Sequence, residues 1–192
     1  MGPLADLKGI DLTHVMAGPT CTLMLADMGA DVIKIEKIPE GDDTRHTPPR
    51  IGNEAASFLM MNRNKRGLAL DLKKPGGAAV LRRLLASADV LVENYAPGVI
   101  ERLGFGYEDL RKTYPALIYC SLSGFGRTGP YKDRRGFDLV ASMAMGSAHP
   151  LNAPYQAFEA ADGWIVVGGA NQRNWLRILE ALQASHLAHD QR

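Results

Sequence analysis

The sequence predicts an α/β protein with a mostly parallel sheet, followed by a short antiparallel α+β segment. Two observations lead to this prediction. Short apolar segments alternate with helix-like segments as far as Phe125, which is typical of βαβ units. After a break in the pattern at Gly146–Pro150, two strand-like runs flank Asp162-Gly163, a turn sequence that favours an antiparallel hairpin. The architecture therefore changes near residue 146.

Five apolar segments of the first part are expected to be strands: Gly9–Val15, Asp31–Glu36, Arg66–Leu72, Asp89–Tyr95 and Leu117–Phe125. The helices between them are expected at 21–30, which closes on a glycine, at 74–88, which is amphipathic and has Pro75 in its first turn, and at 96–104 and 106–115.

The Pro- and Gly-rich polar stretch at 37–55 is expected to be a long surface loop, and such loops are usually functional or mobile. After the last strand of the first part, helical spacing of apolar residues at Phe137–Ala144 predicts a further helix before the break at Gly146–Pro150. A hairpin over Tyr155–Ala170 and a helix over 171–183, with Asn171 as its N-cap, are expected after the break.

Composition narrows the class of protein. The 192 residues are 46% hydrophobic and 22% charged, with a net charge of +1, so bulk electrostatics indicate neither a nucleic-acid nor a membrane-surface partner. No apolar run approaches the ~20 residues of a membrane span, and the N-terminus lacks the apolar core of a signal peptide. Cys21 and Cys120 lie far apart in the sequence and are interpreted as buried thiols of a reducing compartment, so a cytoplasmic location is expected.

Small residues at Ala17–Thr20 connect the first strand to the first helix. Backbone N–H groups at a helix N-terminus can bind an anion, although a tight turn without a ligand remains an alternative. Glu36 ends the second strand, where a dinucleotide-binding protein places the carboxylate that holds a ribose. Because the loop lacks G-x-G-x-x-G, an NAD-binding oxidoreductase stays only an alternative.

Basic residues gather around the third strand: Arg63, Lys65, Arg66, Lys73 and Lys74. Such side chains beside strand ends suit a polyphosphate ligand, with a solvated run of charges as the commoner explanation.

Glu93, Asn94 and Tyr95 end a buried strand, and ligands of open α/β sheets bind outside the carboxyl ends of strands. An exposed amide and aromatic ring there suit a purine or a pantetheine amide, with ordinary turn chemistry as the alternative. His14 is interpreted as a core or loop residue, and no zinc, Walker or G-x-S-x-G pattern occurs, so no metal is expected.

Several long motifs together resemble the class III CoA-transferases. These are "LKGIDLTHVMAGPTCTLMLADMGADVIKIEK", "MNRNKRGLALDLKKPGG", "DVLVENYAPGVIERLG", "YCSLSGFGRTGPYKDRRGFDLVA" and "PYQAFEAADGWIVVGG". The resemblance implies a Rossmann-like CoA-binding large domain, here residues 1–146, and the beginning of a small domain, here residues 147–192. It also implies interlocked homodimers that act on an acyl-CoA and a carboxylic acid.

The resemblance assigns coenzyme A contacts to six positions: Lys37, Leu70, Lys73, Asn94, Tyr95 and Arg102. Lys37 would lie near the adenine and phosphates, Lys73 and Arg102 would contact phosphates, and Leu70 would flank the nucleotide.

In the family an aspartate attacks the acyl-CoA thioester and forms an acyl-enzyme anhydride. No aspartate lies between Asp138 and Asp162 of this sequence, and neither of these two is assigned as the nucleophile. We therefore expect an internally deleted and C-terminally shortened family member without an assigned catalytic residue. A non-catalytic CoA-binding protein is the alternative.

Two positions point to the type of reaction. Phe137 stands where the family's racemases have a histidine, which favours a transferase, and Met16 stands where formyl-CoA transferase has a glutamine, which disfavours formyl and oxalate substrates. The start of the small domain resembles transferases that act on dicarboxylates.

Overall fold

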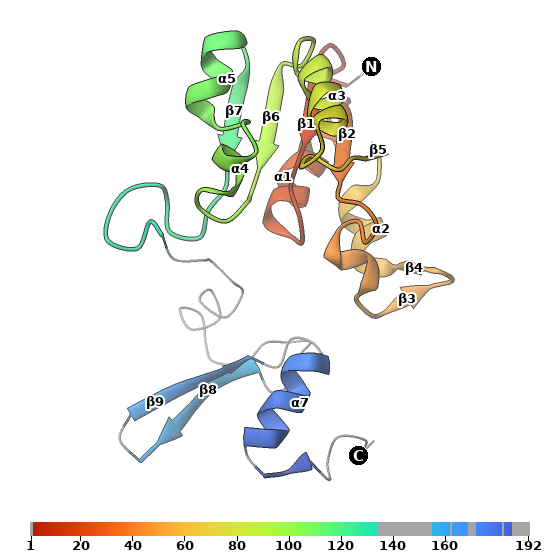
Figure 1. Ribbon diagram of the computed structural model, residues 1–192. Helices are drawn as coiled ribbons and strands as arrows, with labels where there is room; N and C mark the ends of the chain where they lie inside the picture. The colour runs from red at the N-terminus through yellow and green to blue at the C-terminus, as the bar shows by residue number, and fades with distance from the viewer. Residues whose placement is uncertain (1, 134–154, 162, 169–171, 182, 186–192) are drawn as a thin grey trace. The chain divides into compact units, whose positions relative to one another are not determined.

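The computed structural model describes residues 2–133, 155–161, 163–168, 172–181 and 183–185. The chain divides into two compact units, Met1–Arg134 and Arg135–Arg192 (Figure 1). The predicted domain boundary at residue 146 and the predicted helix at Phe137–Ala144 lie outside the described residues.

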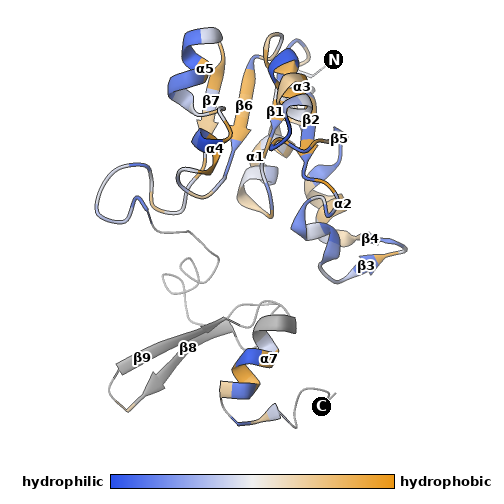
Figure 2. Ribbon diagram, in the orientation of Figure 1, coloured by the Kyte–Doolittle hydropathy of each residue, from blue (hydrophilic) through white to orange (hydrophobic). Residues whose placement is uncertain are grey.

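The first unit is built on a five-stranded parallel sheet with the strand order β5-β2-β1-β6-β7. Its strands are β1 (Lys8–Asp11), β2 (Asp31–Glu36), β5 (Lys65–Ala69), β6 (Val90–Glu93) and β7 (Ile118–Ser121). The parallel α/β fold is thus confirmed. In Figure 2, β6 is hydrophobic along most of its length, as expected for a central strand covered on both faces.

Most strands end earlier than the sequence predicts. The strand expected at Gly9–Val15 ends at Asp11, because the Asp11 carboxylate accepts hydrogen bonds from the backbone N–H and the hydroxyl of Thr13. Such local side-chain bonds turn the backbone away from the ladder. The turn brings the residues after β1 to the carboxyl edge of the sheet.

One face of the sheet carries α3 (Pro75–Leu85), α4 (Val99–Arg102) and α5 (Tyr107–Thr113). Pro75 occupies the first turn of α3, where its missing N–H costs nothing. Buried side chains of these helices form one cluster with side chains of the strands: Ile10, Leu12, Ile35, Leu81, Leu85, Leu91, Ile100, Phe105 and Leu110. Each such apolar side chain contributes about 1.5–3 kcal/mol when fully buried.

The opposite face carries α1 (Ala17–Asp27) and α2 (Ala56–Asn62), which pack against each other. Ala26 of α1 packs with Val32 of β2. Successive side chains of a strand point to opposite faces of the sheet, so Val32 lies on the face opposite to that of its neighbour Ile33. Gly18 allows α1 to approach the turn after β1 closely, because a Cβ atom there would lie 2.3 Å from the Cβ of Thr13. The glycine in the first turn of α1 therefore serves helix packing.

Most residues of the predicted surface loop at 37–55 are exposed as expected, but the stretch has more structure than a loop. This stretch contains the 3₁₀ helix η1 (Asp43–His46) and the short antiparallel pair β3 (Arg50–Ile51) and β4 (Glu54–Ala55), and α2 follows directly. Asp42 is fully buried and caps η1 by accepting a hydrogen bond from the Thr44 N–H. Asp42 and Thr44 are buried and bonded to each other, while most of the segment is exposed.

The second unit contains the hairpin of β8 (Tyr155–Ala160) and β9 (Gly163–Gly168), followed by α7 (Gln172–Ala181). The predicted antiparallel hairpin and helix are confirmed, while Asp162 and Asn171 lie outside the described residues. No helix among the described residues is long and apolar enough to cross a membrane.

Candidate functional site

A pocket of about 160 Å³ lies at the carboxyl edge of the parallel sheet, beside the ends of β2 and β5. Four of the six residues that the sequence singles out line it: Lys37, Leu70, Lys73 and Tyr95. The remaining wall comes from Ile35, Glu36, Asp71, Leu72, Val99 and Leu103. Open α/β sheets bind their ligands at this edge, so the pocket lies where the fold favours a ligand.

The two lysines at the pocket differ in their partners. The Lys37 ammonium pairs with the exposed Asp43 carboxylate at 2.6 Å. The backbone N–H of Lys73 donates to the Asp71 carboxylate, and its exposed side chain makes no ion pair with any described residue. Lys73 is therefore the more available cation for an anionic ligand.

Asn94 is held by the backbone of His14. Its amide N–H₂ donates to the His14 carbonyl at 2.8 Å, and its amide oxygen accepts from the His14 N–H at 2.9 Å. The expected exposed amide is therefore half-buried, and both ends of it are occupied by protein groups. Asn94 joins the turn after β6 to the loop after β1.

Tyr95 is also half-buried, and its ring meets the His14 ring edge-on, with the ring centroids 5.5 Å apart. Burial, with smaller contributions from the charges of Glu93 and Asp11, raises the pKa of the Tyr95 hydroxyl to about 12. The hydroxyl therefore stays protonated near neutral pH and can donate a hydrogen bond to a ligand.

Arg102 lies on α4 and is exposed, outside the residues that line the pocket. Its guanidinium lies against the preceding turn, since a Cβ atom at Gly98 would be 2.9 Å from its Nη1 atom. Gly98 has φ +77° and begins the helix. The helix also supplies Val99 to the pocket wall, so Arg102 lies within one helical turn of it.

Sequence reasoning missed a network of buried charges whose members do not line the pocket. Lys34 of β2 is 2% exposed, and its ammonium pairs with the Asp42 carboxylate at 2.8 Å and donates to the Thr13 carbonyl at 2.9 Å. A second pair joins Lys65 to Asp11 at 3.1 Å. The signal that could have revealed them is a charged residue inside an apolar strand, because such a charge must find a partner.

Glu36 is not free to hold a ribose. Arg45 donates to both of its carboxylate oxygens at 2.7 and 2.8 Å, and the Asp42 N–H donates to one of them at 2.9 Å. Burial alone would raise the pKa of Glu36, but these bonds and the nearby positive charges hold it below its usual value. Glu36, the residue that suggested NAD binding, is thus engaged in a structural ion pair with Arg45.

The basic group around β5 separates into two sets. Arg63 pairs with Asp27, Lys65 is buried against Asp11, and Arg66 makes a two-point ion pair with Asp31. These residues lie at or before the amino end of β5, whereas Lys73 and Lys74 lie beyond its carboxyl end. Only this second set is placed to meet a ligand in the pocket.

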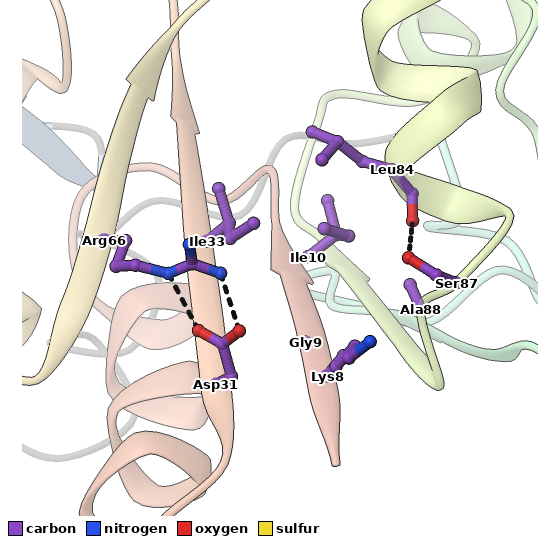
Figure 3. A pocket seen from close by; sticks show the side chains of 9 residues that line it. All are labelled: Lys8, Gly9, Ile10, Asp31, Ile33, Arg66, Leu84, Ser87 and Ala88. Carbon is purple, nitrogen blue, oxygen red and sulfur yellow. Dashed lines mark hydrogen bonds and ion pairs between the residues drawn. The ribbon is translucent and has the colours of Figure 1, made fainter. Parts of the chain in front are cut away.

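A larger hollow of about 230 Å³ lies at the opposite, amino edge of the sheet, between α3 and the starts of β1 and β2 (Figure 3). Ile10, Ile33 and Leu84 give it an apolar floor, and the Arg66–Asp31 pair stands at its rim. In this larger hollow the arginine is already neutralised, and the hollow lies away from the carboxyl ends of the strands. The smaller pocket is therefore the better candidate site.

Among the described residues no group of three or more His, Cys, Asp or Glu side chains is arranged to hold a metal ion. Cys21 and Cys120 are free thiols and are half-buried. Burial and the neighbouring Cys21 thiol raise the pKa of the Cys120 thiol, so it stays protonated.

A family model described as CoA-transferase family III matches residues 4–151 and again residues 141–192. The chain belongs to CoA-transferase family III. Succinyl-CoA:glutarate CoA-transferase of Homo sapiens is 47% identical to this family member over 148 residues, which cover 77% of the chain and 34% of the human protein. Formyl-CoA:oxalate CoA-transferase of Afipia carboxidovorans is 48% identical over 146 residues, with 76% and 34% covered. The match thus spans about a third of the length of these relatives.

Solved structures agree with the fold of this CoA-transferase family III chain. A CAIB/BAIF family protein from Brucella suis superposes with a TM-score of 0.68 at 30% identity, covering 100% of this chain and 72% of that chain. The protein Rv3272 from Mycobacterium tuberculosis gives a TM-score of 0.69 at 26% identity, with 100% and 72% covered. The α/β architecture and the family inferred from the motifs are both confirmed.

Acid will destabilise the first unit in two steps. Burial lowers the pKa of His14 below its ordinary 6.5, so stability begins to fall below about pH 6.5, where the unfolded chain takes up a proton more readily. The pKa values of Glu36 and Asp42 lie below their ordinary 4.5 and 3.8, so a second loss sets in below about pH 4.5. Urea unfolding between pH 8 and 2 measures both steps. His14→Gln is expected to remove the first step only; an unchanged slope near pH 6 in that variant contradicts the assignment.

Proposed function

We propose that this protein binds an acyl-CoA thioester at the carboxyl edge of its parallel sheet and is of the type that transfers CoA to an acceptor carboxylic acid. The pocket lined by Lys37, Leu70, Lys73 and Tyr95 carries the proposal. The pocket combines three features: the Lys73 ammonium, which has no ion-pair partner among the described residues, an apolar wall, and the protonated hydroxyl of Tyr95. Phosphates, the adenine ring and the pantetheine amides need these three kinds of group.

The proposed acceptor is a dicarboxylic acid. Relatives named succinyl-CoA:glutarate CoA-transferase and succinate–glutarate CoA-transferase are 47% and 46% identical to the chain, and others are named for oxalate. Met16 supports a four- or five-carbon acid over oxalate. The proposal includes a homodimer that acts on small molecules in the cytoplasm. The two free thiols support the cytoplasmic part, since the cytoplasm is a reducing compartment.

Binding without transfer is a second candidate function, favoured by one feature of the sequence. No aspartate occurs between Asp138 and Asp162, so the segment expected to carry the nucleophile offers none. The family model also matches in two separate pieces, residues 4–151 and 141–192, rather than one. Both observations support an internal deletion, and under this candidate the chain binds CoA and releases it unchanged.

Two measurements test these proposals. Calorimetric titration is expected to show binding of CoA and none of NAD; binding of NAD alone, or no binding of CoA, overturns the proposed site. Mass spectrometry of a mixture of succinyl-CoA, glutarate and the protein then follows the appearance of glutaryl-CoA. Exchange together with an acyl-enzyme trapped by hydroxylamine establishes the transferase reaction in this chain, whereas CoA binding without exchange establishes the second candidate.

A further inference from the structure

Glu93 is a fully buried carboxylate at the carboxyl end of β6, next to the turn that supplies Tyr95 to the pocket. One of its oxygens accepts a hydrogen bond from the backbone N–H of Tyr95 at 2.8 Å. The other accepts from the Ser121 hydroxyl and from Nη2 of Arg127, the latter at 2.6 Å. Both oxygens of the Glu93 carboxylate therefore accept hydrogen bonds, one from the turn after β6 and the other from Ser121 and Arg127.

Arg127 is the only cation that pairs with Glu93 among the residues that the structure describes. It lies in the glycine-containing loop after β7, and it also contacts Ser121 through Nε at 3.0 Å and Glu101 of α4 through Nη1 at 3.4 Å. One guanidinium thus reaches β6, β7 and α4. An arginine fork suits this role better than a lysine, because it donates several bonds in fixed directions.

The Glu93 carboxylate needs this cation. Removing a carboxylate from water is costly unless a charge and hydrogen bonds compensate it, and loss of one partner of such a pair leaves the other uncompensated. Without Arg127 the Glu93 side chain is driven towards water or a proton, and its bond to the Tyr95 N–H must change as well. The next residue, Asn94, holds both backbone groups of His14, so the disturbance extends to the loop after β1.

We propose that Arg127 is a positioning residue of the coenzyme A pocket: through Glu93 it fixes the turn that carries Asn94 and Tyr95. This inference rests on the proposed function for its ligand, but the positioning itself is a property of the free protein. A purely structural ion pair would affect stability and leave the pocket geometry and ligand affinity of the folded protein unchanged. A positioning residue affects both.

The first test uses the free protein. In ¹⁵N–¹H spectra, Arg127→Met is expected to move the Tyr95 and Asn94 amide signals, whereas Arg111→Met, which removes an exposed arginine paired with Glu108 on α5, leaves them in place. Arg127→Lys is expected to return them part of the way. Unmoved Tyr95 and Asn94 amides in folded Arg127→Met overturn the inference, whatever the protein binds.

The second test measures the dissociation constant for CoA by calorimetry at a temperature where every variant is folded. Arg127→Met is expected to weaken binding about tenfold or more, Arg111→Met less than about twofold, and Arg127→Lys by an intermediate factor. Glu93→Gln combined with Arg127→Met is expected to bind more tightly than Arg127→Met alone, because no charge is then left unpaired. Equal affinities of Arg127→Met and the unaltered protein contradict the inference. Absence of CoA binding by the unaltered protein overturns the proposed function instead and leaves the spectra to decide the positioning role.

Discussion

Replacing Asp42 with alanine is expected to lower the free energy of unfolding by about 3–5 kcal/mol. Asp42 is fully buried, and its carboxylate is the ion-pair partner of Lys34, which is itself 2% exposed. The substitution leaves the ammonium without its counter-charge in the interior and also removes the cap of η1, since Asp42 accepts the Thr44 N–H. Urea denaturation at pH 7 measures the effect.

Asp43→Ala is the matched control for this prediction. Asp43 is the next residue and also pairs with a lysine, but its side chain is 63% exposed and that of Lys37 is 46% exposed. Solvent screens such a pair, so the expected change is below about 1 kcal/mol. Lys34→Met combined with Asp42→Leu is expected to be more stable than Asp42→Ala alone, because neither charge remains. Equal losses in Asp42→Ala and Asp43→Ala would refute the buried pair.

Removing Lys73 and Arg102 together by alanine substitution is expected to weaken CoA binding about 100-fold. Lys73 lines the pocket, and Arg102 lies one helical turn from its wall. Their positive charges are the ones we propose to contact the phosphates, and each charge-assisted bond contributes to affinity more than a neutral one. Calorimetric titration at two salt concentrations measures the loss, which is expected to shrink at high salt.

The control carries the same loss of charge elsewhere on the surface. Arg83 on α3 and Arg111 on α5 are exposed and outside the pocket, so the double variant Arg83→Ala/Arg111→Ala changes net charge equally. Its affinity for CoA is expected to stay within about threefold of the unaltered protein. A comparable loss in both double variants would mean that only the overall field attracts the ligand, and no loss in Lys73→Ala/Arg102→Ala would place the phosphates elsewhere.

The five strands of the parallel sheet and helices α1, α3, α4 and α5 could be predicted because their hydrophobic pattern is strong, whereas α2 was not predicted. Strand ends could not, since β1 stops where the Asp11 side chain binds the backbone of Thr13, an interaction that periodicity does not register. The stretch at 37–55 is mostly exposed as predicted, but its buried residues were missed for a related reason. Polar composition indicates exposure only when the polar groups lack partners inside the protein, and Asp42 has its partner in Lys34 on β2.

The candidate site was predictable to a different degree at each position. Strand ends alone indicated the region of Asn94 and Tyr95, and the basic cluster included Lys73, but the choice of Lys37 and Leu70 came from resemblance to a family. Whether an amide is free to meet a ligand depends on long-range bonds such as that between Asn94 and His14, 80 residues apart. Long-range contacts also explain the two cysteines. Cys21 and Cys120 lie far apart in the sequence, but the fold brings their thiols together.

The two edges of the sheet differ in a way that matters for handling the protein. The edge strand β5 carries Lys65 and Arg66, and charged side chains of this kind discourage other chains from adding to a sheet. At the other edge, β7 presents Ile118 with 61% of its surface exposed, followed by Tyr119 and Cys120. Aggregation during expression and concentration should therefore begin at β7. A lysine in place of Ile118 is the simplest change for a more soluble preparation, because that side chain points away from the cluster that packs the core.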